Sequence, residues 1–190
     1  MRILQKMNIF IFIAMFSLNF LLISDVKSST KNKNIEELLD KLEFSQSSIE
    51  AENIRKKIWK YWIYNVPDNL LNNLQYALSE FYAGRLISAE KAFTDLINEE
   101  PNYVEGWNKR ATIRYMINNL EGSLSDIEKV LDLQPRHFGA ISGSGLIYIK
   151  KKKYTKALKI YKLLNKIDPM NTENVKFMIL INKMMLDKSI

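Results

Sequence analysis

The four prolines of this 190-residue chain are evenly spaced. They are Pro67, Pro101, Pro135 and Pro169, each 34 residues after the one before it. Proline interrupts a helix, and a fixed period of this length is the signature of a repeat architecture whose units stack on their neighbours. Only six glycines occur, which favours helices over a turn-rich β architecture. The spacing therefore predicts an all-α solenoid with one proline-ended unit per period.

The register can be tested at positions that the prolines do not fix. With the proline at position 32, the repeats are 70–103, 104–137 and 138–171. Small residues recur at positions 8 and 20, which hold Ala77, Ala111 and Gly145, and Ala89, Ser123 and Ala157. Large residues recur at positions 17 and 24, which hold Leu86, Leu120 and Tyr154, and Phe93, Ile127 and Tyr161. Small side chains are needed where helix axes approach closely, and large ones where helices diverge.

On these residues, and on Trp107 at position 4, the chain resembles the tetratricopeptide-repeat family. The resemblance covers 70–171 and implies a right-handed α-solenoid of about three helical hairpins. Asn73 replaces the family tryptophan, and Glu80 and Arg114 stand where a tyrosine is usual, so the details of packing are less determined than the fold. The chain is also similar to small signal-bearing proteins of this family in Gram-negative bacteria.

Residues 1–28 have the parts of a secretory signal peptide. Arg2 and Lys6 precede an apolar stretch at 7–23, and Val26 and Ser28 suit cleavage before Ser29. The alternative is a retained inner-membrane anchor, since 17 residues lie at the lower limit for spanning a bilayer. We expect an exported protein, periplasmic if the signal is cleaved and membrane-associated only if residues 7–23 are retained.

The repeats are flanked by less regular segments. Residues 29–66 are predicted to form a linker and a degenerate helical pair, with Trp59 and Trp62 packed on the first helix of repeat one. The alternative role for these tryptophans is a ligand platform. Residues 172–188 are predicted to form a capping helix with Thr172 as its N-cap. Its inward residues are predicted to be Val175, Ile179 and Met184.

The composition argues against an enzyme. The chain has no cysteine and one histidine, His137, which leaves no thiolate, disulfide or Cys-based metal site and no convincing proton relay. Carboxylates such as Asp126 and Glu128 are predicted to be solvent-facing or capping. We therefore expect no catalytic residue, cofactor or metal.

Charge does not indicate nucleic-acid binding either. The net charge is +7, but the lysines are spread along the chain among many acids. The single dense run, from Lys150 to Lys153, is predicted to be a turn at a helix end.

The resemblance implies that a protein or peptide binds the concave face, which the first helix of each hairpin lines. The predicted partner surface comprises Asn108, Lys109, Thr112, Tyr115, Ser142 and Gly143. A glycine inside a helix costs about 1 kcal/mol relative to alanine, so Gly143 indicates either a close approach by the partner or simple tolerance. Chaperone-binding members of the family hold the C-terminal carboxylate of their partner with a lysine and an asparagine. Leu74 and Leu78 occupy those two positions here, so this clamp is absent.

The sequence thus favours a non-enzymatic exported adaptor or scaffold. The alternative is a regulatory or substrate-presenting subunit of a cell-envelope enzyme. Arg110 and Arg114 lie one turn apart near a helix interface, so they are predicted to be structural, with one of them reaching Glu80 in the preceding repeat.

Overall fold

The computed structural model describes residues 33–187, so the predicted signal peptide and its cleavage site lie outside the described residues. The described residues divide between two units, 33–40 and 41–187. Residues 33–43 are helical, and no strand occurs anywhere in 33–187. No helix in this described part is both long and apolar enough to cross a bilayer.

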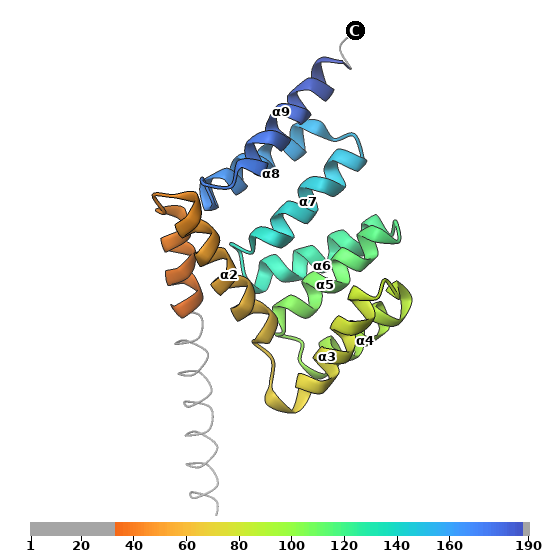
Figure 1. Ribbon diagram of the computed structural model, residues 1–190. Helices are drawn as coiled ribbons and strands as arrows, with labels where there is room; N and C mark the ends of the chain where they lie inside the picture. Colours follow the sequence, from red (N-terminus) through yellow and green to blue (C-terminus); the bar gives the residue numbers. More distant parts are fainter. Residues whose placement is uncertain (1–32, 188–190) are drawn as a thin grey trace, which may run out of the picture. The chain divides into compact units, whose positions relative to one another are not determined.

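Three helical hairpins follow one another within the second unit (Figure 1). They pair α3 (Leu71–Tyr82) with α4 (Leu86–Glu99), α5 (Val104–Met116) with α6 (Leu120–Leu133), and α7 (Phe138–Lys150) with α8 (Tyr154–Ile167). The all-α repeat prediction is confirmed, and α5 and α7 begin at the first residues of their predicted repeats. A short 3₁₀ helix, Asp68–Leu70, precedes α3.

Each hairpin turns at the same position of the repeat. Gly84, Asn118 and Lys152, all at position 15, have φ angles of 72°, 66° and 56°. Glycine and asparagine tolerate this left-handed conformation, whereas a lysine in it is less common. The run from Lys150 to Lys153 therefore forms the predicted turn, with α7 ending at Lys150 and α8 beginning at Tyr154.

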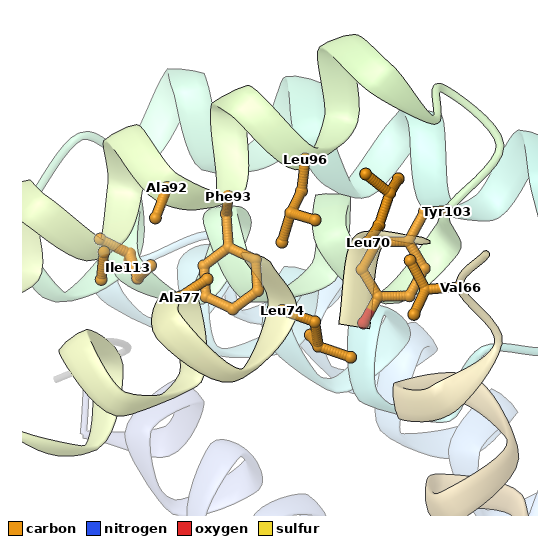
Figure 2. Close-up of a cluster of buried hydrophobic side chains, with 10 residues drawn as sticks. Val66, Leu70, Leu74, Ala77, Ala92, Phe93, Leu96, Tyr103 and Ile113 are labelled. Atoms are coloured by element: carbon orange, nitrogen blue, oxygen red, sulfur yellow. The ribbon is translucent and has the colours of Figure 1, made fainter. Parts of the chain in front are cut away.

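The core of the first hairpin continues into the second (Figure 2). Phe93 and Leu96 from α4 lie beside Leu74 from α3, and all three are buried. Ile113 of α5 belongs to the same cluster, so apolar packing joins repeat one to repeat two. Large residues at position 24 thus fill the space between helices, as predicted, and their burial supplies the main stabilisation of the stack.

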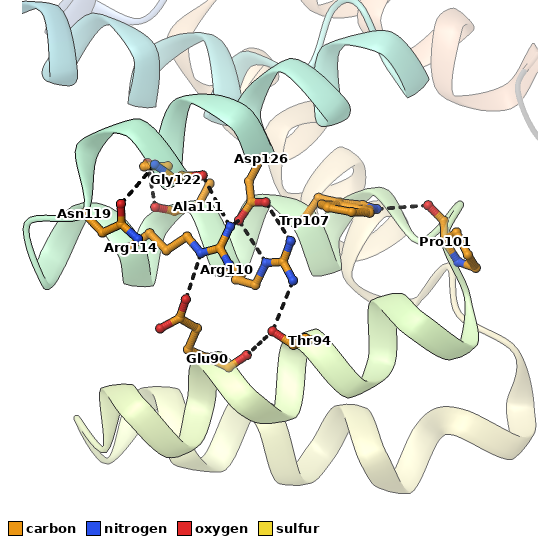
Figure 3. Close-up of polar contacts among 11 residues, drawn as sticks. Glu90, Thr94, Pro101, Trp107, Arg110, Ala111, Arg114, Asn119, Gly122 and Asp126 are labelled. Atoms are coloured by element: carbon orange, nitrogen blue, oxygen red, sulfur yellow. Dashed lines mark hydrogen bonds and ion pairs between the residues drawn. The ribbon is translucent and has the colours of Figure 1, made fainter.

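Charged groups also connect these two repeats (Figure 3). Arg110 donates to both carboxylate oxygens of Asp126, at 2.9 and 2.8 Å, and Arg114 donates to Asp126 at 3.0 Å and to Glu90 at 2.8 Å. Both arginines are structural, but the predicted partner was wrong. Glu80 instead accepts from Arg85 at 2.8 Å, because Arg85 at the start of α4 is nearer. Asp126 was also wrongly predicted to be exposed or capping, since it is 1% exposed.

Helix α2 (Ser48–Tyr64) does not stack as a further repeat. Trp62 stacks on His137, with ring centroids 3.8 Å apart, and Trp59 meets Phe138 edge to face. These contacts lie at the start of α7, so the prediction that both tryptophans pack on the first helix of repeat one was wrong. Their large rings instead cover the turn between repeats two and three.

The last helix, α9 (Thr172–Leu186), packs on α8 with a different face from the predicted one. Ile181 is fully buried and Phe177 stacks on Tyr161. Val175 and Ile179, predicted to face inward, are 42% and 65% exposed. The predicted cap was wrong by one residue: the Asn171 side chain accepts from the Glu173 amide, and Thr172 is already the first helical residue.

Candidate functional site: a cavity between the second and third hairpins

A cavity of about 340 Å³ lies between the first helices of the second and third hairpins. One wall comes from α5, with Asn108, Thr112 and Tyr115, and the other from α7, with Ser142 and Gly143. The register explains this placement, because residues at positions 5, 9 and 12 of a first helix recur on one face. The cavity also touches the second helices α6 and α8 through Ile127 and Leu164.

Helix α2 forms the third wall of the cavity through Arg55 and Trp59. Arg55 donates to both carboxylate oxygens of Asp168, in the turn after α8, at 2.9 Å each. Burial raises the pKa of Asp168, and the hydrogen bond and charge of Arg55 oppose this rise. At the other end of α2, the Tyr103 hydroxyl donates to the carbonyl oxygen of Ile63 at 2.7 Å. Helix α2 therefore contacts the turns that end all three repeats (Figure 1).

A buried polar cluster supports this edge of the cavity. Glu105, which is 0% exposed, accepts from the amide of Asn108 at 3.0 Å and from the ammonium of Lys109 at 3.1 Å. His137 Nδ1 accepts from the Ala140 amide, so Nε2 carries the proton and donates to Glu105 at 3.2 Å. Burial on its own would raise the pKa of Glu105, but the hydrogen bond of His137 and the charge of Lys109 bring it below its ordinary value. His137 thus has a structural role.

Comparison with known proteins agrees with the repeat geometry. No protein-family model matches the chain. A TPR repeat-containing protein of Rhizobium etli is 32% identical over 120 residues, which are 63% of this chain and 59% of that protein. This chain therefore spans about three fifths of that relative's length.

Two solved structures have the same fold. The first TPR of Spaghetti (RPAP3), bound to an HSP90 peptide, is 18% identical, with a TM-score of 0.59 over 65% of this chain and 98% of that chain. A tetratricopeptide repeat protein from Parabacteroides merdae is 20% identical, with a TM-score of 0.57 over 84% of this chain and 61% of that chain. Identities at this level show the fold alone.

The 34-residue period, the small-residue columns and the observed hairpin bounds coincide with these similarities. The hairpins have the tetratricopeptide-repeat fold. The cavity lies between α5 and α7, the first helices that the resemblance predicts to line the concave face.

Five of the six predicted partner residues of the tetratricopeptide stack line the cavity: Asn108, Thr112, Tyr115, Ser142 and Gly143. Lys109 does not. Its ammonium lies 5.7 Å from the centre of the Trp59 ring and 5.6 Å from that of Phe81, in addition to its ion pair with Glu105. Lys109 is therefore held between repeat one and α2.

Two glycines of α7 have different surroundings. A methyl group at Gly139 would lie 2.5 Å from the Trp59 ring, so the docking of α2 requires a glycine at this position. At Gly143 the nearest atom to such a methyl group is Ile127 Cδ1, at 3.4 Å, an ordinary contact. Packing within the described residues thus explains Gly139 but leaves Gly143 open to the cavity.

Sequence reasoning missed the cavity residues outside the first helices of the repeats. Arg55 and Trp59 come from α2, whereas Asp168, Asn171 and Asn174 come from the end of the third repeat and the start of α9. The available signal was the spacing of Arg55, Trp59 and Trp62, which places all three on one helical face. No group of three or more potential metal ligands occurs in the part of the chain that the structure describes.

Proposed function

We propose that this chain is an exported, non-enzymatic tetratricopeptide scaffold that binds a protein or peptide at the cavity between α5 and α7. The observation that carries the proposal is the convergence of five predicted groove residues on one cavity. Gly143 supports it, because no described neighbour requires a glycine there. Concave, partly apolar sites with a few polar groups are the usual form of binding sites.

The comparisons support protein binding as the class of function. The Spaghetti repeat domain of similar fold is bound to an HSP90 peptide. In this chain Leu74 is 1% exposed and Leu78 packs against the same core cluster, so the positions that carry a carboxylate clamp in chaperone-binding relatives face apolar neighbours. The partner proposed here is therefore not a chaperone tail held by such a clamp.

Site-specific photo-crosslinking tests the binding site. A benzoylphenylalanine at Thr112, in the cavity wall, is expected to crosslink the partner polypeptide in envelope extract. The same group at Ser125, an exposed residue of α6, is the matched control and is expected to give no product. Products from Ser125 alone would place the binding surface elsewhere and contradict the proposal.

The identity of the crosslinked product separates the two candidate functions. Several unrelated polypeptides would favour an adaptor, and one stoichiometric enzyme would favour a regulatory subunit of a cell-envelope enzyme. Export is tested independently by sequencing the N-terminus of the protein recovered from cells. A start at Ser29 is expected after cleavage, and an intact Met1 on membrane-bound protein would indicate the anchor.

A further inference from the structure

Apolar side chains reach the cavity from each of its walls. Its apolar side chains come from five helices: Trp59, Ala111, Ile127, Phe138, Leu146 and Leu164. Burial of apolar surface against such a lining is favourable whatever group provides it. The cavity therefore has the means to hold an uncharged side chain.

The charged groups in the lining are already paired. Arg55 and Asp168 are the charged residues among those that line the cavity, and they bind each other at 2.9 Å. The Asp168 side chain is 3% exposed, so a charged ligand would have to disrupt a buried ion pair to replace either partner. The described lining therefore offers no unpaired charge to a carboxylate or an ammonium group.

Most polar groups of the lining are also occupied within the protein. The Asn108 amide donates to Glu105, the Thr112 hydroxyl to the Asn108 carbonyl oxygen, and the Ser123 hydroxyl to the Ala111 carbonyl oxygen. The Asn174 amide donates to the Asp168 carbonyl oxygen. A ligand thus gains more from apolar contact here than from hydrogen bonds.

The volume is sufficient for a large side chain. About 340 Å³ is near the lower end of the range of roughly 300–1,000 Å³ that is usual for ligand pockets. We propose, on the basis of the binding function above, that the cavity receives one large apolar side chain, of the size of leucine, methionine or phenylalanine, from the partner polypeptide. This side chain anchors the partner, and the paired charges of the lining exclude acidic and basic anchors.

Peptides that differ at a single residue test this specificity. The host is a blocked seven-residue serine–glycine peptide with leucine, phenylalanine, alanine, lysine or glutamate at its centre. Binding to the ¹⁵N-labelled full-length chain is followed through the amide signals of Gly139 and Gly143. The leucine and phenylalanine peptides are expected to bind at least about tenfold more tightly than the alanine peptide, because burial of the larger side chain removes more apolar surface from water.

Two variants fill the cavity from opposite walls, and one serves as control. Gly143→Leu on α7 and Thr112→Leu on α5 are expected to abolish the preference for the leucine peptide. Ser125→Leu, which adds the same side chain at an exposed residue of α6, is expected to retain it. Thermal melting shows whether each variant is folded. The test still works if one of the two filling variants does not fold.

Equal affinity for all peptides, or a preference for glutamate or lysine, would overturn the proposed anchor. So would a leucine preference that survives in both filling variants. If Thr112 crosslinks a partner but the peptides show no apolar preference, the binding function stands and the anchor specificity is wrong. If neither experiment gives binding at the cavity, both are wrong.

Discussion

At the scale of single residues, the buried charges of this protein hold the repeats together. Asp126 is 1% exposed and accepts hydrogen bonds from Arg110 and Arg114, while Arg114 also reaches Glu90 in the preceding repeat. The Arg110 guanidinium also lies 4.8 Å from the centre of the Trp107 ring, which adds a cation–π contact. Loss of any one of these charged side chains would leave the buried charge of another without its partner.

Asp126→Asn is expected to destabilise the protein by about 3–5 kcal/mol, because it leaves two partly buried guanidinium groups with too little negative charge. Urea unfolding monitored by circular dichroism measures the change. Glu121→Gln is the control, since the side chain of Glu121, which pairs with Lys151, is 79% exposed, and its loss is expected to cost about 1 kcal/mol or less. Equal effects of both variants would contradict the network.

A second residue-scale prediction concerns pH. Hydrogen bonds from Arg85 and Ser88 lower the pKa of Glu80 from 4.5 to about 2. Because the folded state favours the ionised carboxylate, this contribution to stability is complete above pH 4.5 and is lost as the pH falls towards 2.

Glu80→Gln is therefore expected to reduce the loss of stability between pH 5.5 and 2.5, as measured by urea unfolding at each pH. Glu128→Gln, at an exposed residue of α6, is the matched control and is expected to keep the pH dependence of the unchanged protein. A Glu80→Gln variant with an unchanged pH profile would show that the Arg85 pair does not stabilise the fold.

At the scale of elements, the two glycines of α7 report on the docking of α2. Gly139→Ala places a methyl group 2.5 Å from Trp59, whose ring is confined by Trp62, His137 and Phe138. We expect a loss of about 1–3 kcal/mol from overpacking. Gly143→Ala meets only Ile127 at 3.4 Å and is expected to stabilise the protein by up to about 1 kcal/mol through helix propensity.

Thermal and urea unfolding of both variants measure this difference. The opposite signs are the essential result, because both substitutions make the same chemical change in the same helix. A Gly139→Ala variant as stable as Gly143→Ala would mean that Trp59 does not lie against α7.

The hairpins were predictable from the sequence, and the arrangement of α2 was not. The period of the prolines and the small residues at positions 8 and 20 are local and repeated, so they predict where α5 and α7 begin. Trp59 and Trp62 satisfied the repeat register as well, but their contacts with His137 and Phe138 join segments about 75 residues apart, which no period encodes. The prediction of the buried face of α9 was wrong because apolar residues occur on nearly all faces of this helix, so the sequence does not distinguish the inward one.

The sequence predicted the part of the candidate site that lies on the repeats, but not the part that α2 contributes. Residues on the first helices, such as Thr112 and Ser142, follow from the register and line the cavity. Lys109 follows the same register but is drawn away by the buried charge of Glu105. Arg55 and Trp59 could not be assigned to the site, because their position depends on where α2 docks.

At the scale of the whole second unit, one helix ties the repeats together and completes the cavity. The contacts of α2 with Tyr103, His137 and Asp168 bridge the turns that end the three repeats. Repeat proteins are stabilised mainly by contacts between neighbouring units, so a helix that bridges three units limits their relative motion. The walls of the cavity are therefore held in place before a partner binds. Binding then costs little conformational entropy.

The central claim is that the partner binds in this cavity, and the affinity of the crosslinked partner for two leucine variants tests it most directly. Isothermal titration is expected to show that Gly143→Leu weakens binding at least about tenfold, because the added side chain fills the space that the partner's anchor needs. Ser125→Leu, on an exposed surface of α6, is expected to bind as the unchanged protein does, and both variants are expected to melt within a few degrees of it. Full affinity of a folded Gly143→Leu variant would contradict the claim and assign the partner to another surface.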